Sequence, residues 1–165
     1  MKTKSALFIF FLTIINSVLS IAQPQKTAMP LPYGEPIRLE QAEKVMAATL
    51  LEASKNNWAM AIAIVDAGGH LVLLKKMDNT QIGSIDVAMG KATTANNFKR
   101  PTKVLEDAVA GGGIGLRLLS LSNVTALEGG EPIIVNGKII GAIGVSGALS
   151  MQDDQVAKAG LSALN

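Results

Sequence analysis

The chain carries few side chains that could do chemistry, and the first of them is a solitary histidine. His70 is the only histidine among the 165 residues, and the chain contains no cysteine. A metal site that needs two imidazoles or a thiolate from one chain is therefore excluded. His70 directly follows a Gly-Gly turn, where partial exposure to solvent is expected. Two interpretations stay open: a turn histidine bonded to nearby backbone, or a group that binds a ligand or moves a proton.

Lys91 is the second candidate, because it lies among small residues on an otherwise apolar helical pattern. A lysine in such surroundings needs a partner for its charge. The first interpretation is an internal ion pair, for which the acidic candidates are Asp66, Asp86 and Glu128. The second interpretation is a contact with an anionic group of a ligand, and both stay open.

Motifs for nucleotide binding and for a serine nucleophile are incomplete. A phosphate-binding P-loop ending at Lys91 would need glycine where Ile85 stands and Ser or Thr where Ala92 stands. The glycine cluster over 111–115 lacks the spacing of a dinucleotide site. Ser146 misses the nucleophile-elbow pattern by one residue and is expected to be a small residue packed at a strand end. No catalytic residue is assigned, and a binding protein is favoured over an enzyme.

The charge of the chain argues against nucleic acid as a partner. The net charge of +2 comes from Lys2 and Lys4, so the chain after residue 22 holds equal numbers of basic and acidic residues. A domain that binds nucleic acid usually shows a basic excess clustered on one face. After residue 22 no basic run exceeds two residues, as at Lys75-Lys76.

The N-terminus has the pattern of a secretory signal peptide over residues 1–22. Two lysines precede an apolar run, and small residues precede the expected cleavage site after Ala22. The apolar run is short and interrupted for a permanent anchor, although an uncleaved anchor is the alternative. We therefore expect a periplasmic or secreted protein without membrane attachment after cleavage. Residues 23–37 are expected to form an extended, proline-rich arm, and residues 38–165 a single domain.

Apolar periodicity and turn residues predict the order α-β-β-α-α-β-β-β-α for this domain. Short turns between neighbouring strands indicate a largely antiparallel five-stranded sheet with packed helices, an α+β fold. The segment over 116–127 is ambiguous between helix and strand, and it supplies one of the five strands. The other expected elements are a helix that begins near Leu39 and ends at Asn56-Asn57, strands over 59–65 and 70–77, helices over about 84–98 and about 101–109, a hairpin around Asn136-Gly137 and a last helix from Ser150.

The hairpin region also carries a family resemblance. Asn136-Gly137 lies between two β-rich runs and supplies the two positive φ angles that a type I′ turn requires. A Gly-Gly-x-Pro-Ile segment begins at Gly129 before the hairpin, and a Gly-x-x-Gly-Val-Ser-Gly strand begins at Gly141 after the turn. Together with motifs earlier in the chain, this region closely resembles the GlcG/HbpS-type haem-binding-protein-like family, to which a domain of cobalamin adenosyltransferases is related. The earlier matching motifs are Leu39–Glu43, Ile64–Val72, Ser84–Ala88 and Arg100–Thr102.

The resemblance implies a profilin-like α+β domain that assembles into homo-oligomers. Some secreted members of the family bind haem or iron and modulate a redox-responsive sensor kinase. The resemblance therefore implies haem as the cofactor, and a small-molecule ligand and a sensor protein as partners. The positions in matched motifs that it implies as ligand contacts are His70, Lys91, Asp66, Glu128 and Gly129. His70 is the implied iron ligand, with a tyrosine and the methionines as competitors.

Three functions follow as hypotheses. The leading one is a protein that binds haem, a related tetrapyrrole or iron, with a redox-sensing accessory role. The second is an enzyme or accessory factor acting on a small hydroxy acid or carboxylate, in which Lys91 binds the anion and His70 moves a proton. The third is a structural oligomeric module. Assembly is also suggested by a strand around Ile62 that is apolar on both faces and by a small-residue helix around Gly90.

Overall fold

The computed structural model describes residues 30–164, so the expected signal peptide and residues 23–29 of the expected arm lie outside the described residues. The two long helices predicted from near Leu39 and from about Ser84 are confirmed. None of the helices within 30–164 is both long and apolar enough to cross a membrane. In chain order the elements are α1 (Leu39–Lys55), β1 (Ala61–Asp66), β2 (Leu71–Lys76), α2 (Ser84–Phe98), α3 (Thr102–Ala110), the 3-10 helix η1 (Gly113–Ser120), β3 (Gly130–Val135), β4 (Lys138–Ser146), α4 (Ser150–Leu161) and the 3-10 helix η2 (Ser162–Leu164).

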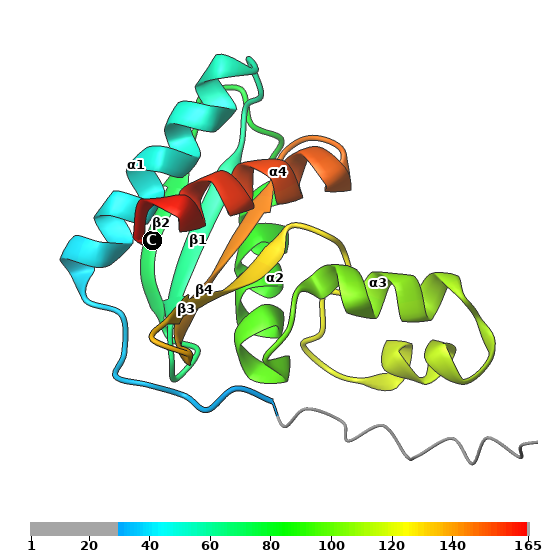
Figure 1. The fold of residues 1–165 in the computed structure, drawn as a ribbon. Helices are drawn as coiled ribbons and strands as arrows, with labels where there is room; N and C mark the ends of the chain where they lie inside the picture. The colour runs from blue at the N-terminus through cyan, green and yellow to red at the C-terminus, as the bar shows by residue number, and fades with distance from the viewer. Residues whose placement is uncertain (1–29, 165) are drawn as a thin grey trace, which may run out of the picture.

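The strands form one antiparallel sheet in the order β2-β1-β4-β3. Helices α1 and α4 cover one face of the sheet and α2 covers the other, which gives three layers (Figure 1). The side of α1 and α4 holds bulky aliphatic side chains, including Ile62 and Ile64. The side of α2 is built from small side chains such as Ala63 and Ala92. The alternation along β1 therefore confirms a strand that is apolar on both faces, and both faces are covered within the chain.

Helix α2 approaches the sheet closely because the residues in contact have almost no side chain. A Cβ atom on Gly144 of β4 would lie 2.0 Å from the carbonyl oxygen of Ala88 and 2.5 Å from the amide nitrogen of Ala92. No residue other than glycine fits at that point without moving the helix. The backbone of α2 therefore lies directly on β4, and this contact fixes the position of Lys91.

The predicted hairpin is confirmed as the β3–β4 connection. Asn136 and Gly137 have φ angles of 50° and 70°, as a type I′ turn requires. Val135 pairs with Lys138 across the turn, and the antiparallel pairing extends to Gly130 and Gly144 with one irregularity. The hairpin forms one side of the sheet, with β3 as its outer strand.

The prediction of five strands is wrong for the described residues, where the sheet has four. The segment over 116–127, counted as the additional strand, begins in η1 and continues as a loop. Leucines alternate with polar residues over 116–118 and again over 119–122, but the adjacent Leu118 and Leu119 shift the pattern to the other face, and the glycines over 111–115 let the chain turn tightly before it. The α+β class, the antiparallel sheet and the helix order are otherwise as expected.

The end of the expected arm is extended and bound along β4. The amide of Gly34 donates to the carbonyl of Ile139 over 2.8 Å, and the amide of Ile37 donates to the carbonyl of Ile140 over 2.8 Å. The amide of Ile139 donates in turn to the carbonyl of Pro32 over 2.9 Å. These bonds place Tyr33 at the end of the sheet where the β1–β2 turn lies.

Helix α3, η1 and the loop that follows project from the side of the three layers (Figure 1). We call this segment, residues 102–127, the α3–η1 extension. Its η1 helix has no buried residue, and Ile114 and Leu119 are 77% and 69% exposed. Leucine side chains of η1 and the following loop line a cavity of about 410 Å³ against α3. The extension thus exposes more apolar surface than a solvated helix needs.

Candidate functional site

His70 lies at the tip of the β1–β2 turn, and Asp66 organises that turn. One carboxylate oxygen of Asp66, Oδ1, accepts the backbone N–H groups of Gly68 and His70, each over 2.9 Å. The same oxygen is 3.5 Å from Nδ1 of the His70 ring. The His70 side chain is 84% exposed. The two expected ligand residues are thus brought together, with the carboxylate beside Nδ1 and the ring in solvent.

The end of α2 and the N-terminal arm meet the same turn. The side-chain amide of Asn96 donates to the carbonyl of Ala67 over 3.2 Å, and the hydroxyl of Tyr33 donates to the carbonyl of Asn96 over 2.7 Å. The Nζ atom of Lys99 lies 4.2 Å from the centre of the Tyr33 ring, a cation–π contact. We call the group of His70, Tyr33, Asn96 and Lys99 the His70 surface.

The His70 surface contains one unsatisfied polar atom. The side-chain oxygen Oδ1 of Asn96 is buried and has no hydrogen-bond partner within residues 30–164. Burial raises the pKa of the neighbouring Tyr33 hydroxyl, so that group stays protonated.

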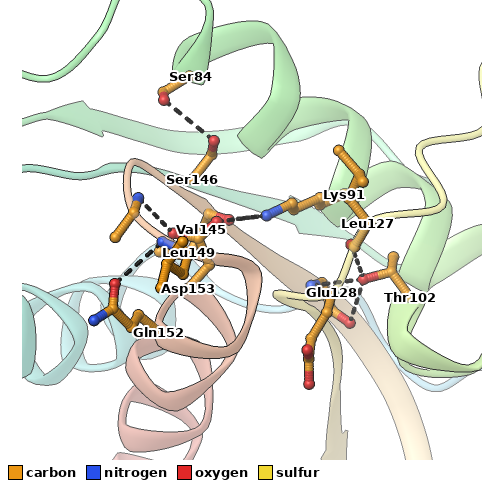
Figure 2. Close-up of polar contacts among 12 residues, drawn as sticks. Ser84, Lys91, Thr102, Leu127, Glu128, Val145, Ser146, Leu149, Gln152 and Asp153 are labelled. Carbon is orange, nitrogen blue, oxygen red and sulfur yellow. Dashed lines mark hydrogen bonds and ion pairs between the residues drawn. The ribbon is translucent and has the colours of Figure 1, made fainter. Parts of the chain in front are cut away.

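Lys91 forms a buried ion pair with Asp153 rather than with any of the three expected partners (Figure 2). Its Nζ atom donates to Oδ2 of Asp153 over 2.7 Å and to the carbonyl oxygen of Val145 over 2.9 Å. The side chains of Lys91 and Asp153 are 2% and 4% exposed. The choice between ion pair and ligand contact is therefore decided in favour of the ion pair in this structure, because solvent does not reach the ammonium group.

Asp153 has a second bond that fixes its orientation. Its other oxygen, Oδ1, accepts the backbone N–H of Ala148 over 3.0 Å, just before α4. Burial raises the pKa of Asp153, and the bond and charge of Lys91 oppose that rise. Asp153 lies in the first turn of α4, where a carboxylate is favoured without any further partner. The pair joins α2, β4 and α4, which are distant in sequence, so no local pattern marks it.

Gly129 packs directly against this ion pair. Its φ angle is +112°, and a Cβ atom there would lie 2.7 Å from Cβ of Asp153 and 3.1 Å from Nζ of Lys91. Glycine is thus required both by the backbone conformation and by the contact. The neighbouring Glu128 donates its backbone N–H to the carboxylate of Glu106. Burial, followed by the nearby charge of Asp154, raises the pKa of Glu128.

Thr102 connects the α3–η1 extension to the same region. Its hydroxyl donates to the carbonyl of Leu127 over 2.6 Å and accepts the backbone N–H of Gly130 over 2.9 Å. Figure 2 shows these bonds beside Lys91 and Glu128. One side chain thereby holds both ends of the extension, a role that the sequence did not reveal.

Ser146 has the structural role expected for it. Its hydroxyl donates to the hydroxyl of Ser84 over 3.2 Å, and Ser146 is buried. Ser146 pairs with Ala61 at the start of β1, whereas His70 follows the end of that strand, roughly 17 Å away along it. His70 therefore cannot act as a base for Ser146. Ser84, the expected N-cap of α2, is instead its first residue, after Gly83.

Of the five expected ligand residues, His70 alone presents its functional group freely to solvent. Lys91 and Gly129 form the buried cluster with Asp153, Asp66 supports the β1–β2 turn, and Glu128 lies near the root of the α3–η1 extension. Within residues 30–164 no group of three or more acids, histidines or cysteines could hold a metal ion.

Comparison with known proteins gives consistent matches. The family described as "Haem degrading protein HbpS-like" matches residues 37–162. Protein GlcG of Escherichia coli (strain K12) is 43% identical over 107 residues, which cover 65% of this chain and 78% of GlcG. A crystal structure of a double mutant of Streptomyces reticuli HbpS has a TM-score of 0.74 and 30% identity, covering 82% of this chain and 91% of that one. The crystal structure of a PduOC:haem complex has a TM-score of 0.72 and 27% identity, covering 79% and 96%.

Proposed function

The chain belongs to the family described as haem degrading protein HbpS-like, and from this premise we propose that it binds haem through His70 on an exposed surface. The membership agrees with the resemblance drawn from the hairpin and turn motifs. The haem-bound relative supplies the ligand class, since PduOC has been crystallised with haem. The observation that carries the proposal in this chain is the exposed His70 imidazole with Asp66 beside it.

The residues around His70 fit a haem group at the surface. An aspartate beside Nδ1 favours the tautomer that carries its proton on Nδ1. The lone pair of Nε2 is then free to bind a metal, an arrangement common among metal-binding histidines. Leu71, which follows His70, and Tyr33, which bonds to Asn96 beside the same turn, are 47% and 41% exposed and offer apolar area near this turn. The cationic Lys99 is suited to a carboxylate of the ligand. Haem bound here would supply a redox-active iron, which the His70 imidazole would hold, while Lys99 would meet a carboxylate of the ligand.

The His70 surface is open, and this bears on how a large flat ligand is held. His70 lines none of the four main cavities of residues 30–164. Ligand sites usually enclose most of the ligand. We therefore include in the proposal a second copy of the chain that covers the other face of the haem. The exposed apolar side chains of the α3–η1 extension give a further reason to expect self-association.

Export and a redox-sensing role belong to the proposal as well. Export is supported by the basic, apolar and small-residue pattern of residues 1–22. A redox-sensing accessory role with a sensor protein is supported by the family resemblance. The alternative function, an enzyme acting on small carboxylates, relied on Lys91 to bind the anion. Lys91 is buried against Asp153, so it is not free for that role in this structure.

Haemin titration of the protein followed by absorbance tests the binding. We expect a shifted Soret band that saturates near one haem per two chains, with the complex about twice the mass of the chain by light scattering. His70→Ala should change the band and weaken binding, whereas Lys75→Ala, an exposed change on β2, should not. Asp66→Asn, which keeps the oxygen that holds the turn, should weaken binding by about tenfold.

Two outcomes would contradict the proposal in different ways. A wild-type spectrum that does not change with haemin would remove haem as the ligand. A His70→Ala spectrum identical to that of the wild type would assign the iron to another residue, and His70 would return to a structural role in its turn.

A further inference from the structure

Two buried carboxyl groups meet between the outer strand β3 and helix α4. Glu131 of β3 and Asp154 of α4 have side chains that are 8% and 9% exposed, and both carboxyl groups face the same ammonium group, that of Lys158. Oε1 of Glu131 and Oδ1 of Asp154 are buried and have no hydrogen-bond partner within residues 30–164. Ionised carboxylates accept hydrogen bonds and donate none, so two of them in contact leave such oxygens unsatisfied.

The surrounding charges do not neutralise two acids. Lys158 lies 2.6 Å from Oδ2 of Asp154 and 3.7 Å from Oε1 of Glu131, so one cation faces two carboxyl groups. The other charged groups in this region come from α2 and the residue after it, α3, α4 and the loop before β3, and two of their three cations are paired elsewhere, Lys91 with Asp153 and Lys103 with Asp107. The groups are Lys91, Lys99, Lys103, Glu106, Glu128 and Asp153.

A single proton resolves both problems. It provides a donor between the two carboxyl groups, and it removes one negative charge from a buried place. Within residues 30–164 no group of three or more acids, histidines or cysteines could hold a metal ion. We propose that Glu131 and Asp154 share one proton near neutral pH, and that this shared proton is a pH-sensitive clamp between β3 and α4.

The pKa of Glu131 agrees with this geometry. Burial, followed by the contact with Asp154, raises the pKa of Glu131 to about 7, while Lys158 opposes the rise. A glutamate in an unfolded chain titrates near 4.3. The folded state therefore holds a proton that the unfolded state has released between these values. The stability contributed by the clamp is complete below about pH 4.3 and is lost as the pH rises through about 7.

Loss of the proton should loosen one side of the domain in particular. β3 is an outer strand and has no neighbour on its other side within the described sheet. Beside Glu131 lies a cavity of about 260 Å³, which Leu161 and Leu164 line from the end of α4 and η2. Repulsion between two carboxylates would act at this contact. Asp153, the residue before Asp154, would transmit a shift of α4 to the Lys91 pair.

Carbon-13 NMR of the side-chain carboxyl groups tests the shared proton directly in the wild-type protein. The Glu131 resonance should titrate with a midpoint near pH 7, and the Asp154 resonance should move in the same step. A Glu131 midpoint below pH 5, or an Asp154 resonance that does not follow, would overturn the proposal. This measurement needs no variant and does not involve haem.

Thermal unfolding between pH 5 and pH 8 tests the clamp. The wild-type melting temperature should fall by about 5 to 10 °C over this range. The melting temperature of Glu131→Gln should fall much less over this range, because the glutamine amide donates a hydrogen bond to Asp154 at every pH. Glu43→Gln, an exposed change on α1, should follow the wild type. At pH 8, amides of β3 and α4 should exchange more slowly in Glu131→Gln than in the wild type, and equal pH dependence in the two proteins would refute the clamp.

Discussion

Removal of Lys91 should destabilise the fold more than removal of any exposed lysine, because it leaves a buried carboxylate alone. In Lys91→Met the aliphatic part of the side chain is kept, while Oδ2 of Asp153 and the carbonyl of Val145 lose their donor. Breaking one side of a buried ion pair costs about 3 to 5 kcal/mol of unfolding free energy. A domain of this size has about 5 to 15 kcal/mol in total. The variant should therefore still fold, but it should unfold at a lower urea concentration than the wild type.

The loss should depend on pH in a defined direction. Burial already raises the pKa of Asp153, and Lys91 opposes that rise. Without Lys91 the pKa of Asp153 in the folded state rises further. The unfolded chain releases this proton at the ordinary pKa of an aspartate, so the unfolding free energy of the variant falls as the pH rises above that value. As the pH falls toward 5, Asp153 takes up a proton, and the difference from the wild type should shrink.

Urea unfolding followed by circular dichroism at pH 5 and pH 8 measures this difference. The double variant Lys91→Met with Asp153→Asn should be more stable than Lys91→Met by about 2 kcal/mol at pH 8, because no buried charge remains. Lys103→Met, which breaks an exposed pair with Asp107, should leave the midpoint unchanged. A Lys91→Met loss below about 1 kcal/mol, or one that is equal at both pH values, would refute the reasoning.

Two further predictions concern a glycine and the N-terminus. Gly129→Ala should lower the unfolding free energy by more than about 2 kcal/mol, since the new Cβ meets Asp153 at 2.7 Å in addition to the strained φ. Gly137 has a φ of +70°, in the left-handed region that other residues adopt at a modest cost, and it has open space around it, so the loss in Gly137→Ala should be about 1 kcal/mol. Equal urea midpoints for the two variants would contradict the packing argument. Intact-mass analysis of protein from a cell-envelope fraction should find Gln23 at the N-terminus, and a mature form that retains Met1 would contradict export.

Much of the fold follows from local pattern. The helical periodicity from Leu39 and from Ser84, the break at Pro101 and the Asn136-Gly137 turn all act within a few residues, and the structure agrees at each place. The fifth strand was wrong because the leucines over 116–127 fit either a helix or a strand. Such a segment becomes a strand only if a neighbouring edge pairs with it, which local sequence does not reveal.

Part of the candidate site also follows from local sequence. The turn that joins Asp66 to His70 is local, since a carboxylate accepting amides two and four residues ahead is a property of one turn. That Lys91 needs a partner could also be inferred, because a lysine among small apolar residues has no local means of satisfying its charge. The family of the chain could also be predicted from the sequence, because the glycine and turn motifs lie along the chain in the order typical of that family.

Which acid meets Lys91 was decided by tertiary structure alone. Asp153 is 62 residues away in sequence and reaches Lys91 because α2 lies directly on β4 and α4 begins just after that strand. The contact between Glu131 and Asp154 depends on the same packing of α4 against the sheet. Residue types and spacing therefore determined the elements, their turns and the exposed histidine. The pairing of buried charges required the packed layers, because a buried charge is satisfied by whichever partner the fold brings within hydrogen-bonding distance.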